Sequence, residues 1–100
     1  MINHIKELIK RGNYAVKLHT RKKMIERGIK IEEVKEAIKN GEIIEEYLDD
    51  KPLPSYLIYG RTKYNRAIHA VVGVNDDMVA IITVYEPEEE KWIDYMRRKR

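Results

Sequence analysis

Side chains that suit proton transfer stand in two apolar runs of this sequence, residues 66–74 and 78–86, which a short Asn/Asp-rich segment joins. Two β-rich runs around such a turn predict a β-hairpin. Because successive side chains of a strand point to opposite faces, one face of the hairpin carries His69, Thr83 and Tyr85 among apolar neighbours. Histidine titrates near neutrality and can act as an acid or a base. His69, assisted by Tyr85, is therefore a candidate catalytic residue.

The register of this hairpin decides which side chains meet. A three-residue loop that pairs Val74 with Met78 places His69 opposite Thr83. The even-numbered face is uniformly apolar and should meet the helices. Its members are Ile68, Ala70, Val72, Val74, Met78, Ala80, Ile82 and Val84. A hydrogen-bonded structural histidine is the alternative interpretation of His69, since polar strand residues often serve packing.

Cationic side chains form the second candidate group. His19, Lys23 and Arg27 recur every four residues, so they share one exposed stripe of a predicted helix. Arg61 and Arg66 neighbour the polar face of the hairpin. Arginine binds phosphate through a planar fork and stabilises charge that develops on it. We therefore expect Arg27, Lys23, Arg61 and Arg66 to bind nucleic acid, and His19 to be a second candidate for proton transfer.

Charge is distributed unevenly along the chain. Residues 1–30 hold nine Lys or Arg against two acids, whereas residues 31–60 hold eight acids against three bases. The formal net charge is +3, and the chain ends in the basic run Arg97, Arg98, Lys99 and Arg100. The two basic ends favour RNA or another nucleic acid as a partner. A solvated charged surface is the alternative interpretation.

Length and composition predict one domain with one core, because 100 residues are the size of an ordinary domain and 43% of them are hydrophobic. No apolar run approaches the roughly 20 residues of a membrane helix. The N-terminal segment MINHIKE has no apolar stretch of the secretory kind. These features predict a cytoplasmic protein without membrane association. Abundant Lys, Arg and Glu, and no glutamine, resemble the bias of hyperthermophile proteins.

Several kinds of chemistry are excluded by residue type. The chain has no cysteine, and its three histidines are scattered without metal-ligand spacing. Ser55 is the only serine, which argues against a serine hydrolase, and no glycine-rich phosphate loop is present. We therefore expect neither a metal nor a cofactor.

Periodicity predicts an α+β fold in which N-terminal helices pack on a four-stranded antiparallel sheet, with a C-terminal helix. Three helical segments are predicted near residues 2–11, 18–27 and 31–38, each followed by a glycine. Strands are predicted at 42–48 and 55–61 and in the two hairpin runs, while residues 14–18 are either a short strand or the lead into the next helix.

The closing stretch, residues 86–100, predicts the C-terminal helix. Pro87 stands where a helix would begin, acids fill the first turn and bases the last, an order that suits the helix dipole. Trp92 and Met96, four residues apart, should anchor this helix on the body of the protein. A base-stacking role for Trp92 is the alternative.

Several segments together resemble the small prokaryotic family called domain of unknown function 4258. They are HTRKKMIERGI, NGEIIEEY, PSYLIYGR, IHAVV and IITVYEPE, followed by Trp92, and the resemblance covers roughly residues 15–97. Family members usually open with H-x-x-x-R-M. Here Lys23 replaces the arginine, whereas Met24, Arg27 and Gly28 match. A lysine there would weaken bidentate phosphate binding.

The predicted order of elements is also similar to that of RelE/ParE-type toxins, whose enzymatic members are metal-independent endoribonucleases. A shared fold does not confer a function. The analogy implies RNA cleavage in which His69 or His19, with Tyr85 or Tyr59, moves protons while arginines hold the phosphate. The alternatives are a non-catalytic nucleic-acid-binding module, or an interaction domain whose acidic stretch 42–50 meets a small protein partner.

Overall fold

The computed structural model describes residues 1–99 and contains, in that range, the three predicted helices. They are α1 (Ile2–Lys10), α2 (Leu18–Arg27) and α3 (Ile31–Lys39). Gly28 ends α2 with φ +65, and the backbone N–H groups of Gly28 and Ile29 donate to the carbonyls of Ile25 and Met24. This pattern is a Schellman cap, which glycine favours because it has no Cβ.

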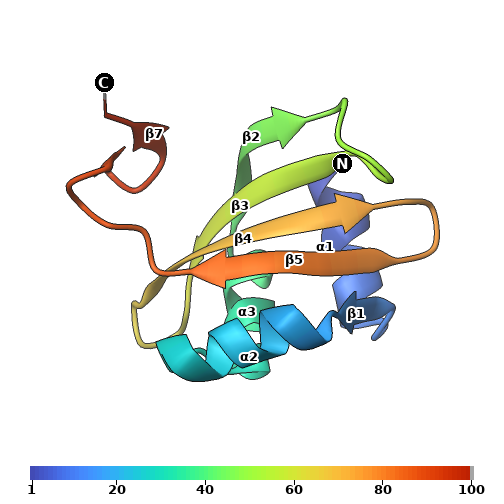
Figure 1. The fold of residues 1–100 in the computed structure, drawn as a ribbon, viewed down its shortest axis with the longest axis horizontal. Helices are drawn as coiled ribbons and strands as arrows, with labels where there is room; N and C mark the ends of the chain where they lie inside the picture. The colour runs from blue at the N-terminus through green and yellow to red at the C-terminus, as the bar shows by residue number, and fades with distance from the viewer. Residues whose placement is uncertain (100) are drawn as a thin grey trace.

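The sheet has five strands in the order β1-β5-β4-β3-β2, so the prediction of four antiparallel strands is wrong by one strand (Figure 1). The strands are β1 (Tyr14–Val16), β2 (Glu42–Tyr47), β3 (Ser55–Arg61), β4 (Ala67–Val74) and β5 (Val79–Tyr85). The last four pair antiparallel, and β1 pairs parallel with β5. Three residues of β1 are too few for alternation alone to identify a strand.

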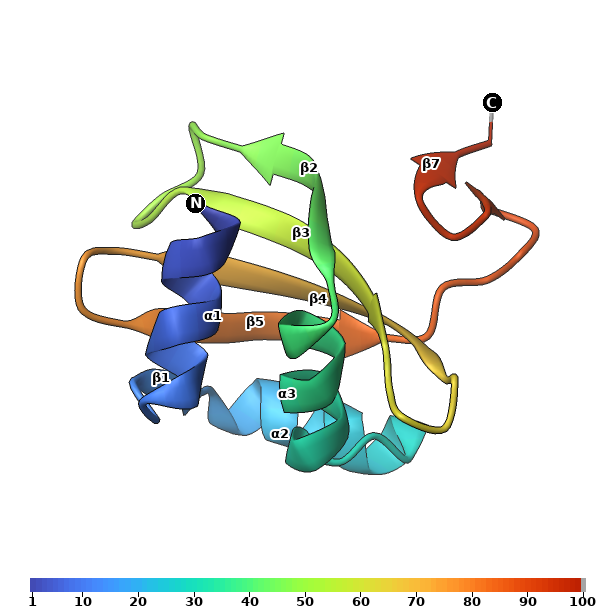
Figure 2. The same cartoon turned by 180° about the vertical axis from the view of Figure 1, so that it is seen from behind.

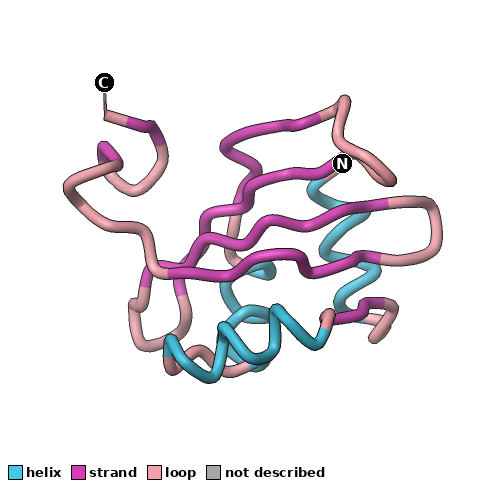
Figure 3. The backbone as a smooth tube through the Cα atoms, viewed as in Figure 1, coloured by secondary structure: helices cyan, strands magenta, loops and turns pink. Residues whose placement is uncertain are grey.

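Helices α1 and α3 cover one face of the sheet, and α2 runs along the outer edge of β5 beyond the end of β1 (Figures 2 and 3). Thr20 Oγ1 of α2 donates to the Ile82 carbonyl (2.7 Å), and an Arg27 guanidinium N–H donates to the Val84 carbonyl (2.7 Å). Helix α2 thereby satisfies carbonyls at the edge of β5 that could otherwise pair with a further strand. The core between these layers contains Ile5, Leu8, Ile9, Met24, Ile29, Val34, Ala37, Ile38, Tyr56, Ile58, Ile68, Ala70, Val72, Val74, Val79, Ile81 and Val84.

The predicted even-numbered core face is correct for β4 and wrong for most of β5. Val74 pairs with Val79 rather than Met78, and a bulge shifts the β4–β5 register between Val71 and Val72. Val79 and Ile81 are fully buried, whereas Ile82 is 37% exposed. A bulge adds one residue to a strand and so reverses which side chains face the core. The alternation of apolar and polar residues cannot locate this bulge, because the odd-numbered and the even-numbered residues of β5 are both mostly apolar.

The predicted C-terminal helix is wrong. Residues 92–98 form a small hairpin of β6 (Trp92–Ile93) and β7 (Arg97–Arg98). Asp94 and Tyr95 have positive φ, 51 and 64, and the Met96 N–H donates to the Ile93 carbonyl to close the turn. The predicted helix also included Arg100, which lies outside the described residues. The acids-then-bases order favours a helix by only tenths of a kcal/mol, and burial of the Trp92 ring in the hairpin outweighs it.

Among the described residues, no helix combines the length and the apolar character needed to cross a membrane.

Candidate active and anion-binding site

His69 lies in β4 on the sheet face opposite the helices and has no exposed surface (0%). Its Nε2 is 2.5 Å from the Tyr95 carbonyl oxygen, and its Nδ1 is 3.2 Å from the Tyr85 hydroxyl. A carbonyl can only accept, so these partners assign the proton to Nε2 and make Tyr85 the donor to Nδ1. Burial lowers the pKa of His69, which favours the neutral ring.

His69 and Tyr85 are therefore direct cross-strand partners, whereas the sequence predicted Thr83 opposite His69. Thr83 pairs instead with Val71, because the bulge shifts the register. Tyr85 is partly buried, and burial raises the pKa of its hydroxyl. The two pKa shifts together favour an uncharged, hydrogen-bonded pair at neutral pH.

Aromatic rings enclose His69 on its outer side. The Trp92 ring lies edge-on at 4.5 Å between centroids, the Tyr85 ring at 5.2 Å and the Tyr59 ring at 5.9 Å. Trp92 is itself only 4% exposed, although it lies outside any helix. We call residues 87–99, which supply Trp92 and the Tyr95 carbonyl, the C-terminal cap. The cap separates the His69 ring from solvent.

An ion pair fastens the cap to the sheet. The Arg98 Nε and Nη2 donate to the two Glu45 carboxylate oxygens at 2.9 and 3.2 Å, and the Tyr47 hydroxyl donates to the same carboxylate. Burial alone would raise the pKa of Glu45, but the Tyr47 and Arg98 hydrogen bonds outweigh it and lower the pKa. The Arg98 guanidinium also lies 4.7 Å from the centroid of the Trp92 ring. At neutral pH Glu45 is therefore a carboxylate that is paired with Arg98.

A pocket of about 530 Å³ opens beside this cluster. We call it the basic pocket, since cations come to it from both ends of the chain. Its lining residues are Arg27, Tyr85, Glu86, Glu88, Lys91, Trp92 and Arg98. The predicted site residues Arg27 and Tyr85 therefore share one wall, and the Tyr85 hydroxyl connects this pocket to His69 behind it.

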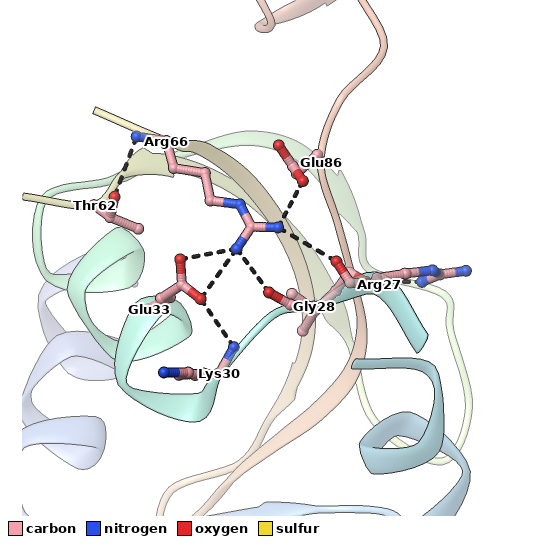
Figure 4. Close-up of polar contacts among 8 residues, drawn as sticks. Arg27, Gly28, Lys30, Glu33, Thr62, Arg66 and Glu86 are labelled. Carbon is pink, nitrogen blue, oxygen red and sulfur yellow. Dashed lines mark hydrogen bonds and ion pairs between the residues drawn. The ribbon is translucent and has the colours of Figure 1, made fainter. Parts of the chain in front are cut away.

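Arg66 occupies a different position from the one its predicted role requires. Figure 4 shows its guanidinium between α2, α3 and β5, where it donates to Glu33 (2.9 and 3.0 Å) and Glu86 (2.6 Å). It also donates to the carbonyls of Gly28 (2.9 Å) and Arg27 (3.3 Å). Any phosphate at Arg66 would have to replace these bonds.

The remaining predicted site residues are dispersed. His19 is exposed on α2, and Lys23 pairs with Glu26 at 3.5 Å. Arg61 donates to the Tyr59 hydroxyl at 2.9 Å and lies 5.2 Å from the centroid of the Tyr95 ring. The basic pocket includes none of the three.

Sequence reasoning missed Glu45 and Lys91 as parts of the site. Glu45 is one of several acids of an edge strand, and nothing local distinguishes it from Glu42 or Glu46. Lys91 stands among acids in a stretch that predicts a helix. The basic chain end was the one available signal, since it includes Arg98.

No group of three or more His, Cys, Asp or Glu side chains within residues 1–99 is arranged to hold a metal ion. The guanidinium and phenol groups of the pocket suit anion binding and proton transfer, and both nitrogens of the neighbouring His69 imidazole already have hydrogen-bond partners.

The fold and site describe an α+β domain with a pocket lined by three cationic side chains beside a hydrogen-bonded His–Tyr pair. The model of the family described as Domain of unknown function (DUF4258) matches residues 16–86, and the chain belongs to this family. The match runs from the end of β1 to the residue after β5, so it excludes α1 and the C-terminal cap. Comparison with curated proteins and with solved structures found no match.

Proposed function

We propose that this domain binds single-stranded RNA at the basic pocket. One observation carries the proposal: the two basic ends of the sequence meet there, with Arg27 supplied by α2 and Lys91 and Arg98 by the cap. Such convergence is expected of a polyanion site, because phosphate neutralisation supplies much of the affinity for nucleic acid. The likeness to RelE/ParE-type toxins belongs to this proposal and has no further support from the comparisons.

Charges around the pocket favour an anion. Arg21 and Lys22 of α2 and Arg97 and Lys99 of the cap are exposed, so the two elements that supply the pocket cations carry further exposed cations. The two acids that line the pocket are paired, Glu86 with Arg66 at 2.6 Å and Glu88 with Lys91 at 3.6 Å. Arg98 is likewise paired, with Glu45 outside the pocket lining, so among residues 1–99 Arg27 is the lining cation that forms no ion pair.

The shape of the site favours a single strand. A concave pocket of about 530 Å³ can accept a phosphate with part of its nucleotide, whereas a duplex needs a broad surface. Tyr85 in the pocket wall is the aromatic type on which an unpaired base stacks, and it is partly exposed, whereas Trp92 is only 4% exposed.

Reversing one pocket charge should weaken RNA binding. For Lys91→Glu we expect affinity for a labelled oligouridylate to fall roughly tenfold and the salt dependence to become shallower. Fluorescence anisotropy across a salt series measures both. Lys10→Glu makes the same charge change at the end of α1, on the opposite face of the sheet, and should have a much smaller effect. An equal loss in both variants, or an affinity indifferent to salt, would contradict a pocket-specific site.

RNA cleavage is the second candidate function, and the Tyr85–His69 hydrogen bond beside the cationic side chains of the pocket favours it. The 2′-hydroxyl would attack phosphorus while its proton passes through the Tyr85 oxygen to His69 Nδ1. The bond between phosphorus and the 5′ oxygen would break. That oxygen would take the proton back from His69 through Tyr85, which leaves a cyclic phosphate and a 5′-hydroxyl. Arg27 and Arg98 would stabilise the extra negative charge.

Tyr85→Phe separates cleavage from binding, because it removes one oxygen and keeps the ring. We expect cleavage of the oligouridylate in EDTA to slow about a hundredfold while its affinity stays within a factor of about two. Product analysis by gel electrophoresis measures the rate. If the unaltered protein leaves the RNA intact, the cleavage hypothesis is wrong and the binding function stands alone.

A further inference from the structure

The C-terminal cap covers the His69–Tyr85 pair without belonging to the core between helices and sheet. None of the described cap residues is a member of that core, although Trp92 is 4% exposed. The family match likewise ends at residue 86, where the cap begins. The sheet and helices thus have their own packed interior, and the cap is added to the opposite face.

Few contacts hold the cap in place. Trp92 packs against His69, Tyr95 accepts from His69 Nε2 and stacks on Tyr59 at 6.3 Å between centroids, and Arg98 binds Glu45. The Arg61 guanidinium of β3 also lies 5.2 Å from the centroid of the Tyr95 ring. Of the ion pairs among residues 1–99, Arg98–Glu45 is the one that joins cap to sheet, and its Arg98 side chain is 61% exposed. The remaining cap hydrogen bonds, such as the Tyr95 hydroxyl to Glu89 at 2.6 Å, are internal to it.

Arg98 belongs to two sites at once, since it fastens the cap through Glu45 and also lines the basic pocket. We propose that RNA phosphate competes with Glu45 for Arg98, so that binding at the basic pocket draws the cap away from Glu45 and uncovers the His69–Tyr85 pair, while Lys91 and Arg98 of the cap stay on the RNA. This regulation rests on the proposed function. A ligand shifts a two-state equilibrium by its preference for one state, and here the preferred state is the one in which Arg98 is free of Glu45.

Release of the cap would change what His69 can do. In the closed form both ring nitrogens are occupied, and Trp92 excludes solvent. Without the cap, Nε2 loses the Tyr95 carbonyl and becomes free to exchange a proton with water or substrate, while Nδ1 keeps its bond to Tyr85 on the sheet. The fold therefore keeps its candidate proton-transfer pair covered until an anion arrives.

Trp92 is the only tryptophan in the chain, so its fluorescence reports the position of the cap directly. Adding the oligouridylate to the full-length protein should move Trp92 emission to longer wavelength as the indole meets water. Glu45→Gln should produce part of this shift without RNA and should tighten RNA binding roughly fivefold, because phosphate no longer competes with a carboxylate.

Glu88→Gln is the matched control. It removes one negative charge from the same pocket but leaves Arg98 on Glu45, so it should tighten binding less and leave Trp92 emission unchanged. RNA binding with an unshifted Trp92 spectrum overturns the cap mechanism and leaves the proposed function intact. If no RNA binds, the proposed function is wrong. Attachment of the cap through Glu45 is then tested by Glu45→Gln alone, and an unshifted Trp92 emission in that variant contradicts it.

Discussion

Gly60→Ala is expected to destabilise the domain by about 3 kcal/mol or more, because no space exists for a methyl group at this position. A Cβ on Gly60 would lie 1.8 Å from the Ala37 carbonyl oxygen and 2.6 Å from its carbonyl carbon. Both atoms are backbone of α3, so rotation of a side chain cannot relieve the clash. Either α3 moves away from β3 or the strand bends, and both disrupt the core around Ile38 and Ile58.

Gly73→Ala provides the matched control within a neighbouring strand. A Cβ on Gly73 would meet Ile82 Cδ1 at 3.3 Å and Leu53 Cβ at 3.6 Å. Ile82 Cδ1 is the flexible end of a side chain, so we expect a change within about 1 kcal/mol. Urea unfolding followed by far-UV circular dichroism measures both variants. Equal stability losses would mean that the approach of α3 to β3 is looser than described.

The helices could be predicted from sequence because their signals are local. The apolar residues of α1 and α3 recur at helical spacing, and Gly28 supplies the positive φ that ends α2. A glycine inside a strand, as at Gly60, indicates close approach by another backbone. Which element approaches is decided by tertiary packing, and Ala37 lies 23 positions earlier in the chain.

The errors arose where distant contacts outweigh local preference. The bulge at Ile82 lies in a strand whose two faces are both mostly apolar, so the apolar–polar alternation of the sequence cannot indicate it. The stretch around Trp92 has good helix signals, yet burial of the indole against His69 stabilises a hairpin instead. Local capping and dipole effects are worth less than the burial of a large aromatic ring.

The candidate site was predicted in part for the same reason. His69, Tyr85 and Arg27 could be selected by residue type and position on a face, and they lie at or beside the basic pocket. Arg66 could not be distinguished from Arg27, because its acceptors Glu33 and Glu86 come from separate elements. Residue type indicates which chemistry is available, whereas packing decides which groups remain free for it.

Arg66→Met should cost roughly 2 to 3 kcal/mol of unfolding free energy, the second large effect that we expect. The Arg66 side chain is 24% exposed, and its guanidinium has four acceptor groups, two carboxylates and two carbonyls at the end of α2. Methionine fills similar space but leaves Glu33, itself 23% exposed, without its cation. Arg66→Lys should recover only part of the loss, because an ammonium cannot reach the same acceptors as a planar fork.

The pH dependence of this loss distinguishes the ion pair from simple packing. Burial alone would raise the pKa of Glu33, but the Lys30 backbone N–H and Arg66 outweigh it and lower the pKa below 4.5. A lowered carboxyl pKa contributes stability that is present above 4.5 and lost as pH falls through the folded-state pKa. The stability gap between Arg66→Met and the unaltered protein should therefore narrow in acid.

Arg11→Met, which breaks an exposed pair with Glu7, should change stability by no more than about 0.5 kcal/mol. A gap at Arg66 that is constant from neutral to acid pH would assign the effect to packing of the side chain rather than to its charge.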